Sequence, residues 1–428
     1  MGDLMNLGPF PRDDGYQVAV ELDRADPLAG YAAGFVGSDP DLVYLDGNSL
    51  GRPPRATIAR INEVLADEWA GRLIRSWSET WWDQADRIGS LIGEIIGADP
   101  ARVIVADSTS IVLFKLTLGA IQARRGRSRI ITDDLNFPTD NYITAAAARL
   151  ERCSVVTIES DGVNGPVDQI IAALDDDTAL LTLSHVLFKS GYLYDMHRLT
   201  AAAHEAGALV LWDLSHSVGV VPIDLGGCGV DLAVGCTYKY LNGGPGSPAF
   251  LYVSDTVAAE VANPVPGWWG HADPFAFDPH YTPASSIHSF QTGTMPILSL
   301  AAAEPGVQMV MDAGIEAIRE KSLAMSEFFM ELAESRLAPL GFELASPEDP
   351  ARRGSHISLR HPDGWRIVQA MVNEGRVIPD FREPDNIRFG MAPLYNTCEE
   401  LHTAIGRIAR IVEAGLHRRY SPERSIVT

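Results

Sequence analysis

The sequence contains little cysteine and little lysine. Its four cysteines, at positions 153, 228, 236 and 398 of 428, are scattered and lack CxxC spacing, a pattern that favours neither a disulfide framework nor a thiolate zinc site. We expect them to be small buried hydrophobic residues. Lysine occurs only at positions 115, 189, 239 and 321, against thirty arginines. Chemistry that needs an amine nucleophile therefore has four candidate residues.

The sequence also lacks any long apolar run. No segment approaches the roughly 18 apolar residues that a membrane-spanning helix needs, and the first residues, MGDLMNLGPFPRDDGY, have neither the basic start nor the apolar stretch of an export signal. We therefore expect a cytoplasmic protein. The net charge of −22 repels polyphosphate backbones and argues against nucleic acids and anionic membranes as partners.

Seven short apolar runs between residues 100 and 255 alternate with segments of helical pattern. Continuous apolar runs of this kind are typical of strands buried on both faces, so the sequence predicts an α/β fold with a mostly parallel sheet. The runs are RVIVAD, RIIT, SVVTIES, ALLTLSHV, ALVLWD, DLAVGC and AFLYV, and helices are expected at residues 109–123, 140–151 and 199–205.

The flanking regions differ from this alternating pattern. Helices are predicted at residues 54–68 and 83–96 before it, and a long helical stretch at 296–337 follows it, leading into mixed strands and helices. We predict an N-terminal segment, residues 1–50, that joins the small domain. A large α/β domain covers residues 51–310, and residues 311–428 form a connector helix and a small α+β domain.

Asp213 and Lys239 follow consecutive apolar runs of the predicted sheet. Because the carboxyl ends of parallel strands meet at one edge, we expect the two side chains to lie close together. Pyridoxal phosphate (PLP) needs such a pair: a lysine that forms a Schiff base with its aldehyde, and a carboxylate that keeps the pyridine nitrogen protonated. His216 would then lie near the ring. Taken singly, Asp213 could equally cap a turn, and His216 could be structural.

A phosphate group needs its own site, and the segment DSTS, residues 107–110, lies at a strand-to-helix junction where an anion is favoured. An ordinary Ser or Thr helix cap would explain the same residues. The glycines of NGGPG, which follow Lys239, match neither common nucleotide-binding motif. We expect Lys115, Lys189 and Lys321 at the surface, which leaves Lys239 as the anchor.

Several motifs together resemble the kynureninase family. YLDGNSLG, ADSTS, NFPTD, WDLSHSVG, GCTYKYLNGGPG, GWWGH and FREPDNIRFGMAPLYNT occur in this order over about residues 25–415. The resemblance implies a fold-type I PLP-dependent enzyme with a seven-stranded sheet, and hydrolytic cleavage of kynurenine, or of 3-hydroxykynurenine, in tryptophan catabolism. It also implies a homodimer with active sites at the interface.

The resemblance assigns roles around the cofactor position by position. Lys239 would be the Schiff-base lysine and the base that moves the α-proton, Asp213 would pair with the pyridine nitrogen, and Tyr238 would bind phosphate and relay a proton. The other cofactor-binding residues implied are Thr109 and Ser110 at the phosphate, Phe137 stacked on the ring, Asp140, Ser184 and His216 near it, and Trp268 and Thr294 from the second subunit.

The resemblance also assigns substrate contacts. Arg388 would clamp the substrate carboxylate bidentately, and Ser49, Trp77 and Thr294 would surround the aryl ring, as in bacterial members that favour kynurenine. Trp77 could instead belong to an aromatic cluster with Trp81 and Trp82. This chain departs from the family at Val112, where asparagine is common.

Two other functions remain open on the sequence. A cysteine desulfurase or selenocysteine lyase would need a reactive cysteine on a mobile loop, but the C-terminal candidate, Cys398, lies in NTCEE, which predicts a helix start with a capping box from Thr397 to Glu400. The second alternative is a PLP-binding homologue without catalytic activity. The sequence does not decide between kynurenine, its 3-hydroxy form and modified analogues, or between a catabolic and a biosynthetic role.

Overall fold

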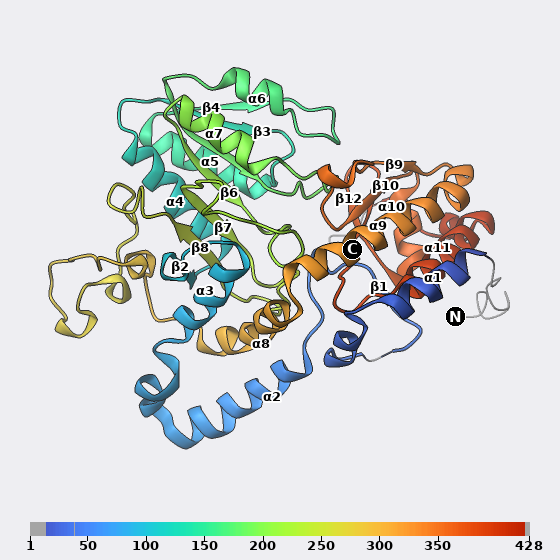
Figure 1. The fold of residues 1–428 in the computed structure, drawn as a ribbon, viewed down its shortest axis with the longest axis horizontal. Helices are drawn as coiled ribbons and strands as arrows, with labels where there is room; N and C mark the ends of the chain where they lie inside the picture. The colour runs from blue at the N-terminus through green and yellow to red at the C-terminus, as the bar shows by residue number, and fades with distance from the viewer. Residues whose placement is uncertain (1–13, 38, 424–428) are drawn as a thin grey trace.

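The computed structural model describes residues 14–37 and 39–423. Two sheets dominate the ribbon, one at the centre of the larger body and one in the smaller body that contains the C-terminal helices (Figure 1). The N-terminal residues 1–13, which our prediction about an export signal concerns, lie outside the described residues. Among those described, no helix is long and apolar enough to cross a membrane.

The large sheet has seven strands in the order β2-β8-β7-β6-β5-β3-β4. All seven apolar runs form its strands, and every neighbouring pair is parallel except those of β8, which lies antiparallel to β2 and β7. The strands are β2 (Val103–Ala106), β3 (Arg129–Asp133), β4 (Ser154–Ile158), β5 (Thr178–Ser184), β6 (Leu209–Asp213), β7 (Leu232–Gly235) and β8 (Ala249–Val253).

Helices cover this sheet, whose central strands are mostly apolar and have no position open to solvent. Each residue of β5, β6, β7 and β8 is buried, as expected for strands without a solvent-facing side. The helix α4 contacts these strands, and α7 contacts β6. The helices of this region are α2 (Arg55–Glu63), α3 (Gln84–Ile95), α4 (Thr109–Ala123), α5 (Pro138–Glu151), α6 (Val167–Ala173) and α7 (Met196–Glu205).

The smaller body has its own four-stranded sheet and its own apolar core. The sheet order is β12-β13-β10-β9, and β1 pairs with β11 beside it. The core includes Ala19, Val43 and Leu45 from the N-terminal segment. Its elements are α1 (Asp14–Ala25), β1 (Val43–Tyr44), β9 (Glu343–Leu344), β10 (Ile357–Arg360), α10 (Gly364–Ala370), β11 (Val377–Ile378), β12 (Asp380–Arg382), β13 (Asn386–Phe389) and α11 (Cys398–Glu413). The domain boundaries at residues 50 and 310 stay a prediction.

Two helices, rather than one, connect the bodies. The predicted stretch 296–337 forms α8 (Ile297–Ala313) and α9 (Ile315–Arg336), divided at Gly314. The φ of Gly314 is +79°, a left-handed conformation that a glycine adopts without steric cost. At the other end of the smaller body, Thr397 and Glu400 form the predicted capping box of α11.

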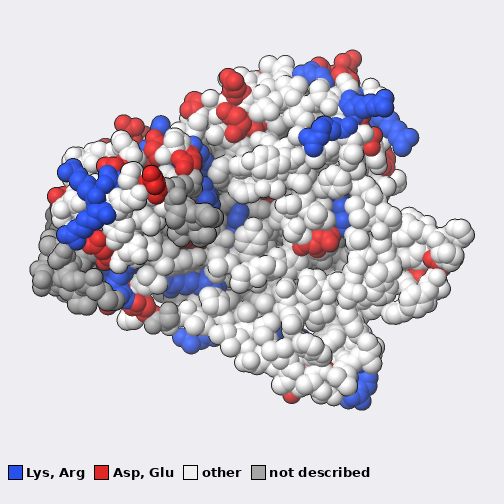
Figure 2. Space-filling model, turned by 180° about the vertical axis from the view of Figure 1, so that it is seen from behind, with Lys and Arg blue, Asp and Glu red and all other residues white. Residues whose placement is uncertain are grey.

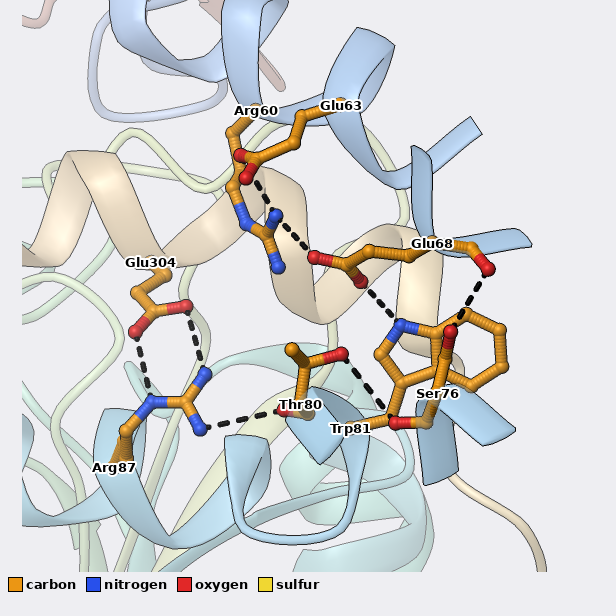
Figure 3. Close-up of polar contacts among 8 residues, drawn as sticks. All are labelled: Arg60, Glu63, Glu68, Ser76, Thr80, Trp81, Arg87 and Glu304. Carbon is orange, nitrogen blue, oxygen red and sulfur yellow. Dashed lines mark hydrogen bonds and ion pairs between the residues drawn. The ribbon is translucent and has the colours of Figure 1, made fainter. Parts of the chain in front are cut away.

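An arm projects from the larger body at the bottom of Figure 1, where α2 continues into π-helical turns at Val64–Arg72 and Trp77–Trp81. The buried Glu68 holds this arm together, as Figure 3 shows. Its carboxylate accepts hydrogen bonds from Arg60 Nη1, at 2.5 Å, and from Trp81 Nε1, while its carbonyl accepts from Ser76 Oγ at 2.8 Å. The arm is therefore an ordered element with a defined shape.

Candidate active site

The large sheet brings the ends of three site-bearing segments together. Ser184 and Asp213 end the neighbouring parallel strands β5 and β6, where they are register partners. Asp213 is in turn the register partner of Val234 in β7, and Lys239 lies in the connection between β7 and β8. The sheet order thus places the predicted carboxylate and the predicted lysine at one edge, as the strand pattern indicated.

Lys239 points toward His216. Its Nζ lies 2.9 Å from His216 Nε2, and it lies 5.8 Å from the ring centroids of Phe137 and Tyr238. Phe137 immediately precedes α5 and contacts Phe188 edge to face, with centroids 5.3 Å apart. The amine therefore has one polar partner and an aromatic frame around it.

Asp213 shares its neighbourhood with a second acid, Asp140, in the first turn of α5. Burial, the charge of Asp213 and a hydrogen bond with it raise the pKa of Asp140 well above its usual range. Two carboxyl groups this close do not both ionise readily, and Asp140 is the one whose ionised form is disfavoured. Asp213 Oδ1 also accepts from Ser215 N at 2.8 Å and from Ser215 Oγ at 2.6 Å. Asp213 is therefore held in place by Ser215, with Asp140 beside it.

His216 is neutral at this site. Burial, followed by the nearby charges of Lys239 and Arg388, holds the pKa of His216 well below its usual range. Its Nε2 can then accept a hydrogen bond from Lys239, while Nδ1 has no partner among the described residues. A buried, unpaired ring nitrogen is costly in a protein alone, and it marks this pocket as one shaped for a further group.

Tyr238 and Ser184 complete the polar surroundings. The neighbouring Cys236 and burial raise the pKa of the Tyr238 hydroxyl, which therefore stays protonated at neutral pH. Ser184 Oγ donates to Asn136 Oδ1 at 2.6 Å. The sequence motif NFPTD gave Phe137 and Asp140 as site residues, and its asparagine, Asn136, orients Ser184 in the same place.

A cavity of about 510 Å³ opens beside Tyr238, at the start of α4. The side chain of Ser108, the residue that precedes α4, makes no capping hydrogen bond, so the simple helix-cap interpretation of DSTS is not supported. The helix start instead faces a space that suits an anion. Hydroxyl groups gather around this cavity, from Ser108, Thr109, Ser110, Tyr238, Ser247 and Thr294.

Thr294 lines this cavity from the same chain as Thr109, although we predicted that it would come from a second subunit. Within this chain, Lys239, the Asp213 and Asp140 pair, and the hydroxyl-lined cavity supply an amine, two neighbouring acids and an anion site. PLP requires those features, so the residues present fit this cofactor.

Arg388, the predicted carboxylate clamp, already has protein partners. It is almost fully buried in β13, its Nη1 donates to Phe188 O at 2.6 Å, and its Nη2 donates to Ser49 Oγ at 3.0 Å and pairs with Asp380 Oδ2. A two-point clamp on a substrate carboxylate would therefore require Asp380 to give up its contact, an arrangement that the sequence did not anticipate.

Trp77 and Trp268 pack among other aromatic side chains of this chain. Trp77 packs against Trp81 and Trp269, with ring centroids 5.4 and 5.3 Å away, and it lines an apolar cavity that shares Met295 and Pro296 with the lining of the anion cavity. Trp268 is 40% exposed, and its ring centroid lies 4.7 Å from that of Trp269. The alternative that Trp77 belongs to an aromatic cluster is thus confirmed for the single chain, with Trp269 as an additional member.

The sequence missed several residues of the site. Asp46 and Asp380 lie near Arg388, and burial together with Asp380 raises the pKa of Asp46 to about 6. His356, which directly precedes β10, is fully buried, and its ring centroid lies 5.4 Å from that of His216. These residues come from the smaller body, and no local pattern links them to Lys239. The motifs YLDGN and RVIPD, which contain Asp46 and Asp380, lie far apart in the sequence, so the sequence did not indicate that the two acids are close.

The surface placement predicted for two lysines was wrong. Lys115 is fully buried, and Lys321 is largely buried and pairs with Asp26 Oδ2 at 2.7 Å. Each ammonium has a carboxylate partner, which makes burial of the charge tolerable. Lys189 is half-buried. Val112, the departure from the family pattern, lies fully buried in the larger apolar core, where a valine packs without an unmet hydrogen bond.

Comparisons of sequence give one family. Residues 318–408 match the kynureninase C-terminal domain. The chain is 44% identical over 398 residues to a kynureninase from Pseudomonas fluorescens, covering 92% of this chain and 94% of that protein. It is 42% identical over 401 residues to a kynureninase from Burkholderia pseudomallei strain 1106a, covering 92% and 95%.

Solved structures with the same architecture are more distant. The cysteine desulfurase CsdA from Escherichia coli has a TM-score of 0.77 at 16% identity, covering 90% of this chain and 98% of that one. A cysteine desulfurase from Thermococcus onnurineus NA1 has a TM-score of 0.76 at 16% identity, covering 92% and 98%. A C-DES mutant with glycine covalently linked to its PLP cofactor has a TM-score of 0.74 at 18% identity, covering 86% and 97%.

These likenesses confirm the predicted fold class, that of fold-type I PLP enzymes, and at such identities they carry no further conclusion. Identity above 40% over more than nine-tenths of the chain is a different kind of finding. On that ground, the chain belongs to the kynureninase family.

Proposed function

We propose that this protein uses PLP to cleave the Cβ–Cγ bond of L-kynurenine with water, giving anthranilate and L-alanine. The observation that carries the proposal is the arrangement of Lys239 against neutral His216, beside the neighbouring acids Asp213 and Asp140, in a chain of the kynureninase family. When bound, PLP supplies an electron sink for the alanyl part of the substrate.

The residues that would hold PLP come from the sheet edge and the start of α4. Lys239 would be its covalent anchor, Asp213 would face the pyridine nitrogen, and Phe137 would stack on the ring. The hydroxyl-lined cavity at Thr109 and Ser110 would hold the phosphate. His216 and Ser184 lie near the ring position, where they would fix its orientation.

Lys239 would also move the proton of the substrate α-carbon. Neutral His216 accepts a hydrogen bond from Nζ and so directs the amine. The Tyr238 hydroxyl, which keeps its proton at neutral pH, would deliver a proton to the β-carbon of the alanyl fragment that remains after anthranilate leaves. A positioned proton donor or acceptor contributes roughly 10²–10⁴-fold to the rate, which is the scale that we assign to each of these groups.

Arg388 and Ser49 would bind the substrate α-carboxylate. Both already converge on Asp380, so the substrate carboxylate would take over part of the place that Asp380 holds in this structure. Charge-assisted hydrogen bonds to a guanidinium give such a contact both strength and orientation.

We further propose that the protein acts as a homodimer. The arm exposes Trp69, Leu73 and Ile74, and a loop at 266–283 exposes Phe275 and Phe277. Both projections are mostly uncharged on the face shown in Figure 2. Large apolar side chains grouped on projecting segments are typical of surfaces that another chain covers. A second copy would bring Trp77 and Trp268 toward a neighbouring site, which would reconcile their assigned roles with their positions.

The cysteine desulfurase alternative is weakened by Cys398. Burial raises the pKa of its thiol to about 12, and the residue begins α11 in an ordered capping box. A nucleophilic cysteine must be accessible and readily ionised. This thiol has the opposite properties.

Incubation with kynurenine, with anthranilate fluorescence as the readout, tests the proposal. We expect anthranilate and alanine in equal amounts, and no sulfide from cysteine. Sulfide release without anthranilate would favour a desulfurase, and turnover of neither substrate would favour a non-catalytic homologue. Comparing kcat/KM for kynurenine, 3-hydroxykynurenine and a ring-modified analogue then tests the aryl-site residues, since a wide preference for the 3-hydroxy compound would contradict our assignment of Trp77 and Thr294.

A further inference from the structure

Lys115 is a buried cation for which the proposed reaction has no use. It lies in the middle of α4 and is fully buried. Its Nζ donates to Asp107 Oδ2 at 2.6 Å, to Phe290 O at 2.7 Å and to Thr292 Oγ1 at 2.6 Å. A lysine ammonium has three hydrogens, and here each has an acceptor. Such complete pairing is what allows a charge to be buried.

The three acceptors belong to two separate segments. Asp107 follows β2 and directly precedes the serine and threonine residues at the start of α4, whereas Phe290 and Thr292 lead into Thr294. Both segments contribute residues to the lining of the anion cavity. The side chain of a helical residue leans toward the helix N-terminus, so Lys115 reaches this end of α4 from within the core. It joins the two segments through one group.

The backbone at Asp107 requires such support. Its φ is +46°, a region that non-glycine residues occupy rarely and at a cost that the surrounding structure must offset. The Lys115 contact, together with the hydrogen bond from Ala249 N to Asp107 O at 3.0 Å, holds this residue in place. The amides and hydroxyls that follow it are thereby aimed at the cavity.

Lys115 also balances the charge beside the cavity. Asp107 lines the cavity and would repel a phosphate group if its charge were uncompensated. The ammonium 2.6 Å from its carboxylate cancels that charge at short range. Without Lys115, an anion would enter next to an unpaired carboxylate.

We propose that Lys115 is a positioning residue for the phosphate of the cofactor: it fastens the 107–110 and 290–294 segments together and neutralises Asp107. This inference rests on the proposed function, because it takes the hydroxyl-lined cavity as the phosphate site. Lys115 itself need not touch the phosphate. It acts on the shape and the charge of the anion cavity.

Equilibrium dialysis of the full-length holoenzyme against graded PLP concentrations tests the inference. Lys115→Met should raise the Kd for PLP by roughly 10- to 100-fold, the scale on which loss of one partner of a buried charge pair acts. Binding of pyridoxal, which lacks the phosphate, should weaken by less than about threefold, because ring contacts at Lys239 and Asp213 are unchanged.

Lys321→Met is the matched control. It also removes a buried ammonium paired with an aspartate, Asp26, but in α9 and away from the cavity lining. We expect it to lower the melting temperature while leaving the Kd for PLP within about twofold of wild type. An equal loss of PLP affinity in both variants would mean general loosening of the fold, and would overturn the inference.

An unchanged Kd for PLP in Lys115→Met, or an equal weakening of PLP and pyridoxal, would also overturn it. If Lys115→Met does not fold, Thr292→Val decides the matter, since it removes one acceptor and keeps the charge. We expect a Kd for PLP raised about two- to fivefold there, as for loss of one hydrogen bond, and an unchanged Kd would contradict the inference. Failure of the wild type to bind PLP would instead contradict the proposed function.

Discussion

The surroundings of Lys239 and the projecting arm differ in how their residues are brought to a site. Around Lys239, strand ends and helix starts of one chain place His216 against the lysine and Asp140 beside Asp213. In the arm, Trp77 packs into an apolar cluster of its own, and large side chains such as Ile74 remain exposed. The contacts of the first region all come from one chain. The second has an apolar surface that none of the described residues of the same chain covers.

The difference shows which site residues can be located from the sheet topology alone. In a parallel sheet, the position of a strand end fixes the position of the residue that follows it. A projecting arm has no such constraint, and the location of its residues depends on what covers it. Predictions for the first region therefore concern chemistry, and those for the second concern association.

The largest effect should follow Lys239→Ala. It removes the covalent anchor and the proton-transferring amine together, so kcat for kynurenine should fall by at least about 10³-fold. Anthranilate fluorescence measures the rate. Circular dichroism should show that the fold is kept, since Lys239 has few contacts that stabilise it. Retention of more than a tenth of the activity would place the chemistry elsewhere.

Arg388→Lys should have the next largest effect. A lysine cannot reproduce the planar fork that contacts Phe188, Ser49 and Asp380, and loss of charge-assisted hydrogen bonds should lower kcat/KM by roughly 10- to 100-fold, mainly through KM. Arg360→Lys is the control. Arg360 pairs with Asp385 on the exposed side of the smaller body, and surface pairs of this kind contribute little, so its kinetics should match wild type.

Ile74→Asp tests whether the second region is an interface. Ile74 is 77% exposed in the arm, and an unpaired charge there would weaken a subunit contact. We expect light scattering to shift from dimer toward monomer, and kcat/KM to fall by about tenfold if a partner's arm completes each site. Leu150→Asp, at a 63% exposed position at the end of α5, should change neither property.

A monomeric wild type, or a monomeric Ile74→Asp variant with full activity, would contradict this expectation. Either result would restrict the site to residues of a single chain. Trp77 and Trp268 would then have no role in the reaction, and the contrast between the two regions would be one of function rather than of assembly.

The smallest effect concerns Asp46, whose pKa is raised to about 6 by burial and by Asp380. Above pH 6 Asp46 is ionised and opposes entry of the substrate carboxylate near Arg388. Below pH 6 it is neutral. The KM of wild type should therefore rise as the pH increases through 6, and Asp46→Asn should remove this rise.

At pH 8 the Asp46→Asn variant should have a KM about fivefold lower than wild type, which corresponds to roughly 1 kcal/mol of charge interaction. Steady-state kinetics from pH 5 to 8 measure both enzymes. A KM for the variant that follows the wild-type profile across this range would show that another group titrates.

Much of the fold could be predicted because its strands are locally marked. The run ALVLWD is apolar up to its final residue, Asp213, and forms the fully buried β6, so the sheet itself places Asp213. The capping box of Thr397 and Glu400 is likewise a local pattern with a local structure. Gly314 was missed as a break because the helical pattern continues on both sides of it.

Contacts between segments distant in sequence could not be predicted. Lys115 looked like a surface lysine because nothing near it in the chain reveals that Asp107, Phe290 and Thr292 converge on its amine. The Asp380 partner of Arg388 lies eight residues away on an adjoining strand, and its pairing depends on the β12 and β13 register. Trp77 was assigned from family resemblance, and its position relative to Lys239 depends on assembly.

The account depends most on a covalent bond between PLP and Lys239, and borohydride reduction tests it directly. Reduction of the holoenzyme, tryptic digestion and mass spectrometry should give a phosphopyridoxyl adduct on the peptide that contains Lys239, and none on peptides containing Lys115, Lys189 or Lys321. An unmodified Lys239 peptide, or an adduct on another lysine, would contradict the account.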